Sequence, residues 1–228
     1  MSPPKTRARP GLSRAVVLDR AVVLADTEGL EAVTVRRLAR DFEVTTMAMY
    51  WHFRTKEDLL AGLGDQVLDA VDVPASTGDW AVDLHAVLVA LVTAMRAHPQ
   101  LAILVHDRIL EHPNGLALTE ITLRGLGAAG FEVGAASYLA MHAWQVAVST
   151  VTTSLVDAGP MTAEEHDDCL RRQQAALAAL PPDRYPAVIA HAESITYGPD
   201  LTANPSLAID HFVAGVQALA PGATRAPG

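Results

Sequence analysis

Residues 34–53 constrain the fold more than any other stretch, because they encode two short helices separated by a tight turn. In the first half, apolar side chains recur at the i, i+3, i+4 and i+7 positions of one helix face: Val35, Leu38, Ala39 and Phe42. Residues 43–45 form the expected turn, and a second helix is expected over 46–53. Thr34 and Thr45 stand where each helix needs an N-cap. The pattern predicts a helix-turn-helix unit.

Helical periodicity continues along the chain, and no alternation typical of a strand reaches a useful length. Ser13 and Asp79 are further N-cap candidates, while Gly29 and Gly130 are stop signals. The sequence therefore predicts an all-α fold of about nine to ten helices. We expect them near 13–28, 34–42, 46–53, 56–71, 80–98, 100–110, 114–129, 133–157, 163–179 and 205–219, with a short segment near 185–195.

Charge divides the chain into two unlike parts. Ten Lys or Arg stand against six Asp or Glu in residues 1–56, whereas residues 57–228 hold seven against twenty. Residues 1–56 would therefore attract a polyanion, whereas residues 57–228 would repel one. The alternative is that the cations of residues 1–56 only form a solvated face. The Pro, Gly and Ser of 72–79 mark a domain junction. We expect a flexible basic arm (1–12), a three-helix domain that holds the helix-turn-helix unit (13–60), a larger helical domain (61–220) and a disordered tail (221–228).

Composition excludes several classes of protein. Half of the 228 residues are hydrophobic and 19% are charged, which argues against a disordered chain. Cys169 is the single cysteine and cannot form an internal disulfide or a cysteine cluster for a metal. No apolar run approaches the length of a membrane span, and the basic start lacks the apolar core of a secretory signal. We expect a soluble cytoplasmic protein.

In a helix-turn-helix unit, the second helix enters the major groove and the first crosses the DNA backbone. Hydroxyls of Thr45, Thr46 and Tyr50 suit phosphates or base edges, and Met47, Ala48 and Trp51 offer apolar surface for a thymine methyl or a sugar. The guanidinium of Arg36 could reach guanine. Lys56 combines an amine with a helix N-terminus, which favours a phosphate.

The stretch LEAVTVRRLARDFEVTTMAMYWHFRTKEDLL (30–60) resembles the DNA-binding domain of the tetracycline-repressor (TetR) family of transcriptional regulators, and the likeness extends over residues 13–65. It rests on Thr34, Ala39, Val44, the Met49-Tyr50-x-His52-Phe53 end of the second helix, and Lys56 followed by Leu59-Leu60. Glu43 departs from the family's usual glycine. A non-glycine residue is therefore expected there near left-handed dihedral angles.

The resemblance implies two sets of DNA contacts. Arg36, Thr46, Met47 and Ala48 would face bases, and Thr34, Thr45, Tyr50, Trp51, His52 and Lys56 would lie near phosphates or sugars. Trp51 and His52 could instead be packing residues. The arm cations Lys5, Arg7 and Arg9 could be a solvated tail or minor-groove contacts.

In TetR-like proteins the larger domain binds a ligand and forms the dimer. Here the resemblance is to the tetracycline-repressor subgroup and rests on Asp79-Trp80, Ala97-His98-Pro99, Gly130-Phe131 and the long helix 133–157. Pocket candidates are Leu88, Leu91, Met95, His106, Thr122, Tyr138, Met141, Trp144, Gln145 and Val148. Dimer-interface candidates are Val151, Leu155, Ile209, Phe212, Val213 and Val216. Phe212 and Val216 could alternatively pack within one subunit.

His106 stands where tetracycline repressors hold the drug-bound magnesium, but a lone histidine on an apolar helix is more often a hydrogen-bonded core residue than a ligand. Val87 and Asp72 replace an amide and a second histidine of that subgroup, which puts tetracycline itself in doubt. We expect no cofactor and no metal site of the protein's own.

These features together predict a homodimeric repressor, not an enzyme, that a small-molecule effector releases from a palindromic double-stranded operator. An activator or a ligand-independent regulator would hold DNA in the same way. A helical enzyme or small-molecule carrier is the remaining alternative, although the sequence lacks a Gly-rich phosphate loop, H-E-x-x-H, G-x-S-x-G and paired cysteines.

Overall fold

The computed structural model describes residues 12–156, 162–198 and 206–221; within these, the side chains of 153–156 and 163 are not described. These ranges contain twelve α-helices and no strand, so the predicted all-α class is confirmed. The helices are α1 Arg14–Glu28, α2 Val35–Asp41, α3 Thr46–Tyr50, α4 Lys56–Asp69, α5 Trp80–Ala97, α6 Ala102–Arg108, α7 Pro113–Ala128, α8 Val133–Val156, α9 Ala163–Ala178, α10 Pro186–Ala190, α11 Ala192–Tyr197 and α12 Leu207–Leu219.

The expected number of helices, nine to ten, was too low. The segment near 185–195 forms two short helices, α10 and α11, because the backbone leaves the helical region at His191 (φ −107°, ψ 10°). The expected arm and tail lie outside the described residues, except Leu12 and Pro221.

The first three helices form a small domain, the head, and each helix begins directly after its predicted N-cap residue. Side-chain oxygens of Ser13, Thr34 and Thr45 accept hydrogen bonds from the backbone N–H groups three residues later, at 3.1–3.3 Å. Gly29 ends α1 with a φ of 86°, which a side chain would disfavour. Glu43 has a φ of 55°, as the family's usual glycine at this position implied.

α3 is shorter than predicted, because it ends at Tyr50 and the chain continues to Phe53 as a turn. Met49 and Phe53 nevertheless point inward, each with 1% of its surface exposed. The shortening therefore leaves the expected division between buried and outward side chains intact.

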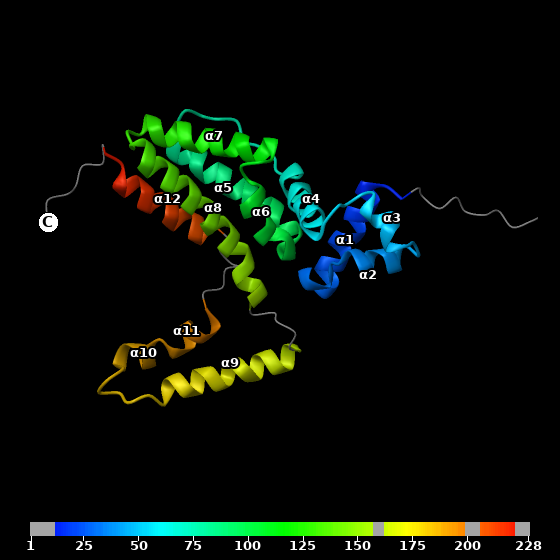
Figure 1. Ribbon diagram of the computed structural model, residues 1–228. Helices are drawn as coiled ribbons and strands as arrows, with labels where there is room; N and C mark the ends of the chain where they lie inside the picture. The colour runs from blue at the N-terminus through cyan, green and yellow to red at the C-terminus, as the bar shows by residue number, and fades with distance from the viewer. Residues whose placement is uncertain (1–11, 157–161, 199–205, 222–228) are drawn as a thin grey trace, which may run out of the picture.

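The regulatory domain is built around α5, which packs against α7, α8 and α12 (Figure 1). Side chains at positions 84, 87, 88, 91 and 95 of α5 are buried and form one face. By length and composition alone α5 could cross a membrane, but half of it is buried inside the fold, as in the core helix of a soluble protein.

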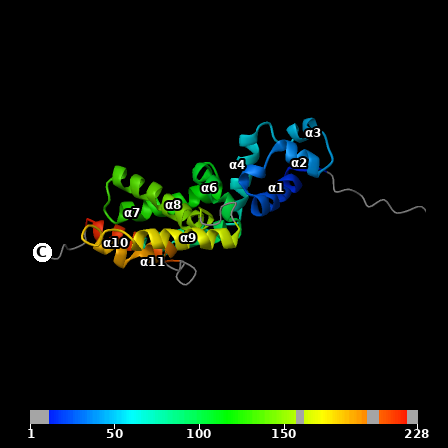
Figure 2. The ribbon, with the colours of Figure 1, turned by 90° about the horizontal axis from the view of Figure 1, so that it is seen from below.

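α4 connects the head to the regulatory domain, since it packs on α1 and more extensively on α6 (Figure 2). Its buried residues include Leu59, Leu63 and Leu68. A change in how α4 sits on α6 would therefore reach the head directly.

The hairpin of α9, α10 and α11 lies apart from the bundle in Figure 1, and its principal contacts are between its own helices. α9 begins with a capping box in which Thr162 and Glu165 bond reciprocally.

Candidate nucleic-acid interface

α3 presents large apolar side chains to solvent. Met47 is 69% exposed, Tyr50 48% and Trp51 85%, while Met49 on the opposite face is buried. Burying side chains of this size is normally favourable, so an exposed group of them on a five-residue helix indicates a contact surface. Thr46 is exposed and Ala48 half-buried beside them. The structure thus places the predicted base-facing residues of α3 on one open face.

The cap threonines retain part of their hydrogen-bonding capacity. The Oγ1 atoms of Thr34 and Thr45 accept bonds from Arg37 N and Ala48 N, at 3.1 and 3.3 Å. A hydroxyl that accepts can still donate its hydrogen, for example to a phosphate oxygen. Both residues can therefore cap a helix and contact DNA at once.

Ion pairs within the head use three of the ten cations counted in residues 1–56. Arg14 pairs with Asp58, Arg20 with Asp41, and Arg37 with both Glu28 and Asp41. Three more cations, in the arm, lie outside the described residues. The rest are exposed and make no ion pair with any described residue: Arg36, Arg40, Arg54 and Lys56. These four cations are therefore the ones in the described head that are available to bind a polyanion.

The Arg20–Asp41–Arg37 network fixes α2 against α1. Partial burial raises the pKa of Asp41, but hydrogen bonds from Arg20 and Arg37 outweigh it and lower the pKa overall. Arg37 also donates to Glu28, which lowers the pKa of Glu28. Arg37 is thereby held inward while Arg36, its neighbour in α2, points to solvent.

Sequence reasoning missed the role of Arg14. Its guanidinium lies 4.4 Å from the centroid of the Phe53 ring and donates to the carbonyl of His52 at 2.9 Å and to Asp58 at 2.9 Å. These contacts hold the turn after α3 against α1. Its position on the outward side of a helical pattern gave no signal, because the partners are 38 to 44 residues away.

The start of α4 is less open than the sequence suggested. Lys56 is exposed, but the Thr55 side chain already accepts from Asp58 N, and the Asp58 carboxylate accepts from Arg54 N. The Arg14 side chain bonded to Asp58 lowers the pKa of that carboxyl group. Lys56 could therefore bind a phosphate through its amine, whereas the backbone N–H groups at the start of α4 are partly occupied. His52 is half-buried at the same turn.

The predicted ligand residues divide into three groups. A cavity of about 350 Å³ between α6 and α8 is lined by Ile103, His106, Asp107, Gln145, Val148, Ser149 and Thr152, and so contains three of them. Leu88, Leu91, Met95, Thr122 and Trp144 are buried in the core and Met141 is half-buried. Tyr138 is 69% exposed and stacks on His142, so the structure does not bring it to the cavity.

Two polar side-chain atoms of the regulatory domain are buried without a described partner. The Oγ1 of Thr122 in α7 and the Nε1 of Trp144 in α8 have no hydrogen-bond partner among the described residues. No group of three or more His, Cys, Asp or Glu in the described ranges could hold a metal ion.

Most predicted dimer-interface residues face the protomer's own core. Val151, Ile209, Val213 and Val216 are at most 7% exposed, because α12 packs on α5 and α8. An interface on these helices must therefore use neighbouring side chains. Phe212 is half-buried with its ring 5.5 Å from that of His142, and the side chain of Leu155 is outside the described set.

Comparisons with known proteins agree with this geometry. The family model described as "Bacterial regulatory proteins, tetR family" matches residues 17–63, and the one described as "Tetracyclin repressor-like, C-terminal domain" matches residues 74–219. The repressor DrrR1 of Streptomyces coeruleorubidus is 28% identical over 96% of this chain and 80% of its own. The class C tetracycline repressor protein of Escherichia coli is 30% identical over 87% of this chain and 88% of its own.

A transcriptional regulator of Saccharopolyspora erythraea is 34% identical, but the match covers 61% of this chain and only 58% of that protein. Among solved structures, apo ActR of Streptomyces coelicolor has a TM-score of 0.75 at 25% identity, with 93% of this chain and all of that chain covered. ActR in complex with actinorhodin gives the same TM-score at 26% identity and the same coverage. These relatives are transcriptional regulators.

Proposed function

Because this chain belongs to the TetR family of transcriptional regulators, we propose that it is a homodimeric repressor, released from a palindromic operator when a small molecule binds its regulatory domain. The observation that carries this proposal is the exposed face of α3, where Met47, Tyr50 and Trp51 stand open to solvent. The protein would act in the cytoplasm, where the operator is accessible.

DNA recognition divides between two kinds of contact. Thr46, Met47 and Ala48 would meet base edges and thymine methyl groups in the major groove, and Arg36 would bond to a guanine. Tyr50, His52, Lys56 and the cap hydroxyls would hold phosphates or sugars and so set the register. Trp51, the most exposed of these side chains, suits a sugar at the groove edge.

The effector would enter the cavity between α6 and α8. Its volume of about 350 Å³ suits a small ligand, and His106, Gln145 and Ser149 supply polar contacts. The unpartnered Thr122 Oγ1 and Trp144 Nε1 offer deeper acceptor and donor sites if the cavity extends inward on binding. ActR, which has been solved with actinorhodin, supports a small-molecule effector for this fold.

The outward faces of α8 and α12 would form the dimer interface. Tyr138 stacks on His142 at 6.0 Å between ring centroids, and Phe212 from α12 lies against the same imidazole. This aromatic group joins α8 to α12, and Tyr138 and His142 are exposed, so a second copy related by a two-fold axis could cover it. The α9–α11 hairpin, which packs chiefly on itself, is a further surface for the partner.

Release of the protein from the operator would depend on a movement of α4. This helix packs on α6, one wall of the effector cavity, and on α1 of the head. A ligand that fits better when α6 is displaced would favour dimers whose α3 helices no longer match the operator spacing. A 100-fold loss of operator affinity requires a difference of roughly 2.7 kcal/mol in ligand binding to the two states.

Fluorescence anisotropy of the full-length protein with DNA from upstream of its own gene tests this proposal. We expect saturable binding that extracts of the producing cell reverse. Binding that no extract changes would contradict release by an effector, and the absence of binding at low salt would contradict the repressor function as a whole. A reporter gene placed behind the same DNA distinguishes repression from activation.

A further inference from the structure

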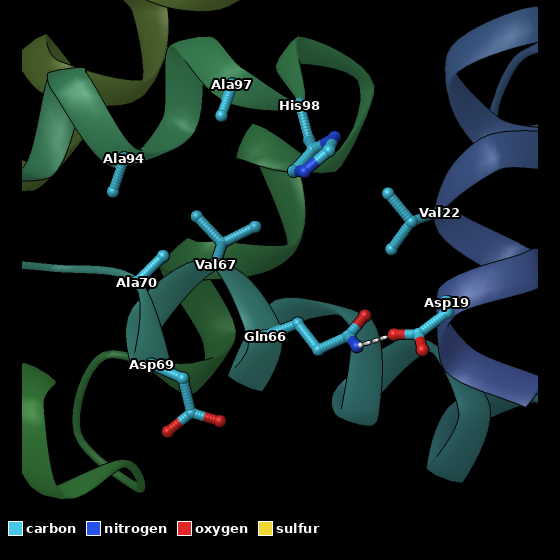
Figure 3. Close-up of a pocket in the computed structure, with 9 residues that line it drawn as sticks. All are labelled: Asp19, Val22, Gln66, Val67, Asp69, Ala70, Ala94, Ala97 and His98. Atoms are coloured by element: carbon cyan, nitrogen blue, oxygen red, sulfur yellow. Dashed lines mark hydrogen bonds between the residues drawn. The ribbon is translucent and has the colours of Figure 1, made fainter. Parts of the chain in front are cut away.

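A cavity of about 550 Å³ lies between the head and the regulatory domain, away from the proposed effector cavity (Figure 3). Its volume is in the range of sites that hold small organic molecules. None of the predicted site residues whose side chains the structure describes lines it. We propose that this cavity, the junction cavity, binds a small organic cation with an apolar body.

Three helices enclose the junction cavity. α1 contributes Asp19 and Val22, α4 contributes the stretch from Gln66 to Ala70 except Leu68, and the end of α5 contributes Ala94, Ala97 and His98. Both α4 and α5 end at this cavity, so the partial negative charge of two helix C-termini falls on it. The fixed backbone charge therefore favours a positively charged occupant.

One hydrogen-bonded pair supplies the acceptors for such a cation. Gln66 Nε2 donates to Asp19 Oδ1 at 3.1 Å, as the dashed line in Figure 3 shows. The amide oxygen Gln66 Oε1 is buried and has no partner among the described residues. A buried acceptor without a donor is unfavourable, and a turn of the Gln66 side chain towards the cavity would let an ammonium group provide the missing N–H. Asp19 would supply the countercharge, because no described residue bonds to its other carboxylate oxygen.

The other charged groups around the cavity are already paired. His98 Nδ1 lies 2.8 Å from Asp26 Oδ2, and His112 Nε2 lies 3.1 Å from Asp69 Oδ1. Figure 3 shows the Asp69 carboxylate directed away from Gln66. No Lys or Arg among the described residues lines the cavity. Asp19 is thus the carboxylate beside the unpartnered Gln66 oxygen, and the apolar lining residues are Val22, Val67, Ala70, Ala94 and Ala97.

The junction cavity lies where a bound ligand could change the position of the head relative to the regulatory domain. One wall is α1 of the head, and the opposite walls are α4 and α5 of the regulatory domain. A bound molecule would therefore fix the distance between the two domains. This consequence for operator affinity rests on the proposed function, whereas binding of the cation does not.

Binding can be measured on the full-length protein without DNA, using the fluorescent primary amine dansylcadaverine. We expect saturable enhancement of dansyl fluorescence, and none with the neutral N-acetyl derivative. Asp19→Asn should weaken binding about fivefold, the factor expected for loss of one partly exposed charge contact. Ala97→Trp should abolish binding by filling the cavity, and because Ala97 is exposed the variant should unfold at the wild-type temperature.

Asp107→Asn is the matched control, since Asp107 is an exposed carboxylate in the cavity between α6 and α8. We expect this variant to bind the probe as the wild type does. The proposal is overturned if dansylcadaverine fails to bind at millimolar concentration, if Asp19→Asn and Ala97→Trp both leave binding unchanged, or if Asp107→Asn alone weakens it. A protein that binds the probe but no DNA would contradict the repressor function and leave the junction site standing.

Discussion

Arg14 Nη2 lies 2.9 Å from Asp58 Oδ1, which joins the first turn of α1 to the first turn of α4 across 44 residues. The same guanidinium lies over the Phe53 ring and bonds to the His52 carbonyl. One side chain thus holds the turn that follows the DNA-facing helix. Residues 51–53 lie beyond the end of α3, and the Arg14 contacts add to the backbone bonds that His52 N and Phe53 N donate to Met49 O at 2.9 and 3.0 Å.

Replacing Arg14 with Ala should destabilise the head by about 1–2 kcal/mol, because an exposed ion pair and a cation–π contact are lost together. Urea unfolding followed by far-ultraviolet circular dichroism measures this loss. Arg171→Ala is the control, since Arg171 also pairs with an aspartate, Asp168, but on the surface of α9. Equal effects of the two substitutions would show that the Arg14 contacts have no special role.

Lys56→Ala should weaken binding to all duplexes about equally and reduce the salt slope by roughly 0.9, as expected for one phosphate contact. Binding isotherms at several salt concentrations measure it, with Arg124→Ala on the regulatory domain as the control. An unchanged slope would remove Lys56 from the interface.

The hydrogen bonds between Asp83 and the loop that joins the domains should make the free energy of unfolding depend on pH in the acid range. It is 5% exposed and accepts bonds from Ser76 and Thr77, which lower its pKa to about 2. Because the folded pKa lies below the unfolded value, the stabilisation is present above about pH 4 and is lost as the pH falls towards 2. Asp83→Asn should cost about 2 kcal/mol at neutral pH, as for loss of hydrogen bonds to a charged group.

Unfolding free energies of the Asp83→Asn variant and the wild type, measured between neutral pH and pH 2, check this prediction. The difference between the two proteins should shrink as the pH falls. A difference that stays constant over that range would mean that the Asp83 carboxylate is not the titrating group.

Glu43 occupies the left-handed region with a φ of 55°, where a β-branched residue is strained and glycine is not. Glu43→Gly should therefore be more stable than Glu43→Val by about 1 kcal/mol or more. Thermal unfolding of the two variants provides the measurement. Equal stabilities would indicate that the turn relaxes out of this conformation.

The sequence was sufficient to predict the head, because caps and apolar spacing there are local signals. Ser13, Thr34 and Thr45 cap the helices as expected, and the strained φ at Glu43 follows from a missing glycine. Sequence could not separate a helix face that packs inside one protomer from a face that meets a partner. Val213 and Val216 show this, because apolar spacing on α12 is the same for both.

Candidate ligand residues were harder to place, because a pocket depends on contacts between distant helices. Tyr138 and Trp144 lie six residues apart on α8, yet one is exposed and the other buried. The junction cavity had no sequence signal at all, since Asp19 and Gln66 meet only when α1 packs on α4.

Selection of bound sites from random duplexes tests most directly whether α3 reads DNA as part of a two-fold dimer. We expect the wild-type protein to enrich a palindrome whose half-sites are about one helical turn, or a multiple of one, apart. Arg36→Ala should relax the preference at one guanine in each half, with a loss on the order of 1–3 kcal/mol. If no sequence is enriched, the assignment of the α3 face to DNA is contradicted. If the Arg36→Ala variant enriches the same palindrome with an unchanged preference, the assignment of Arg36 to a base is contradicted.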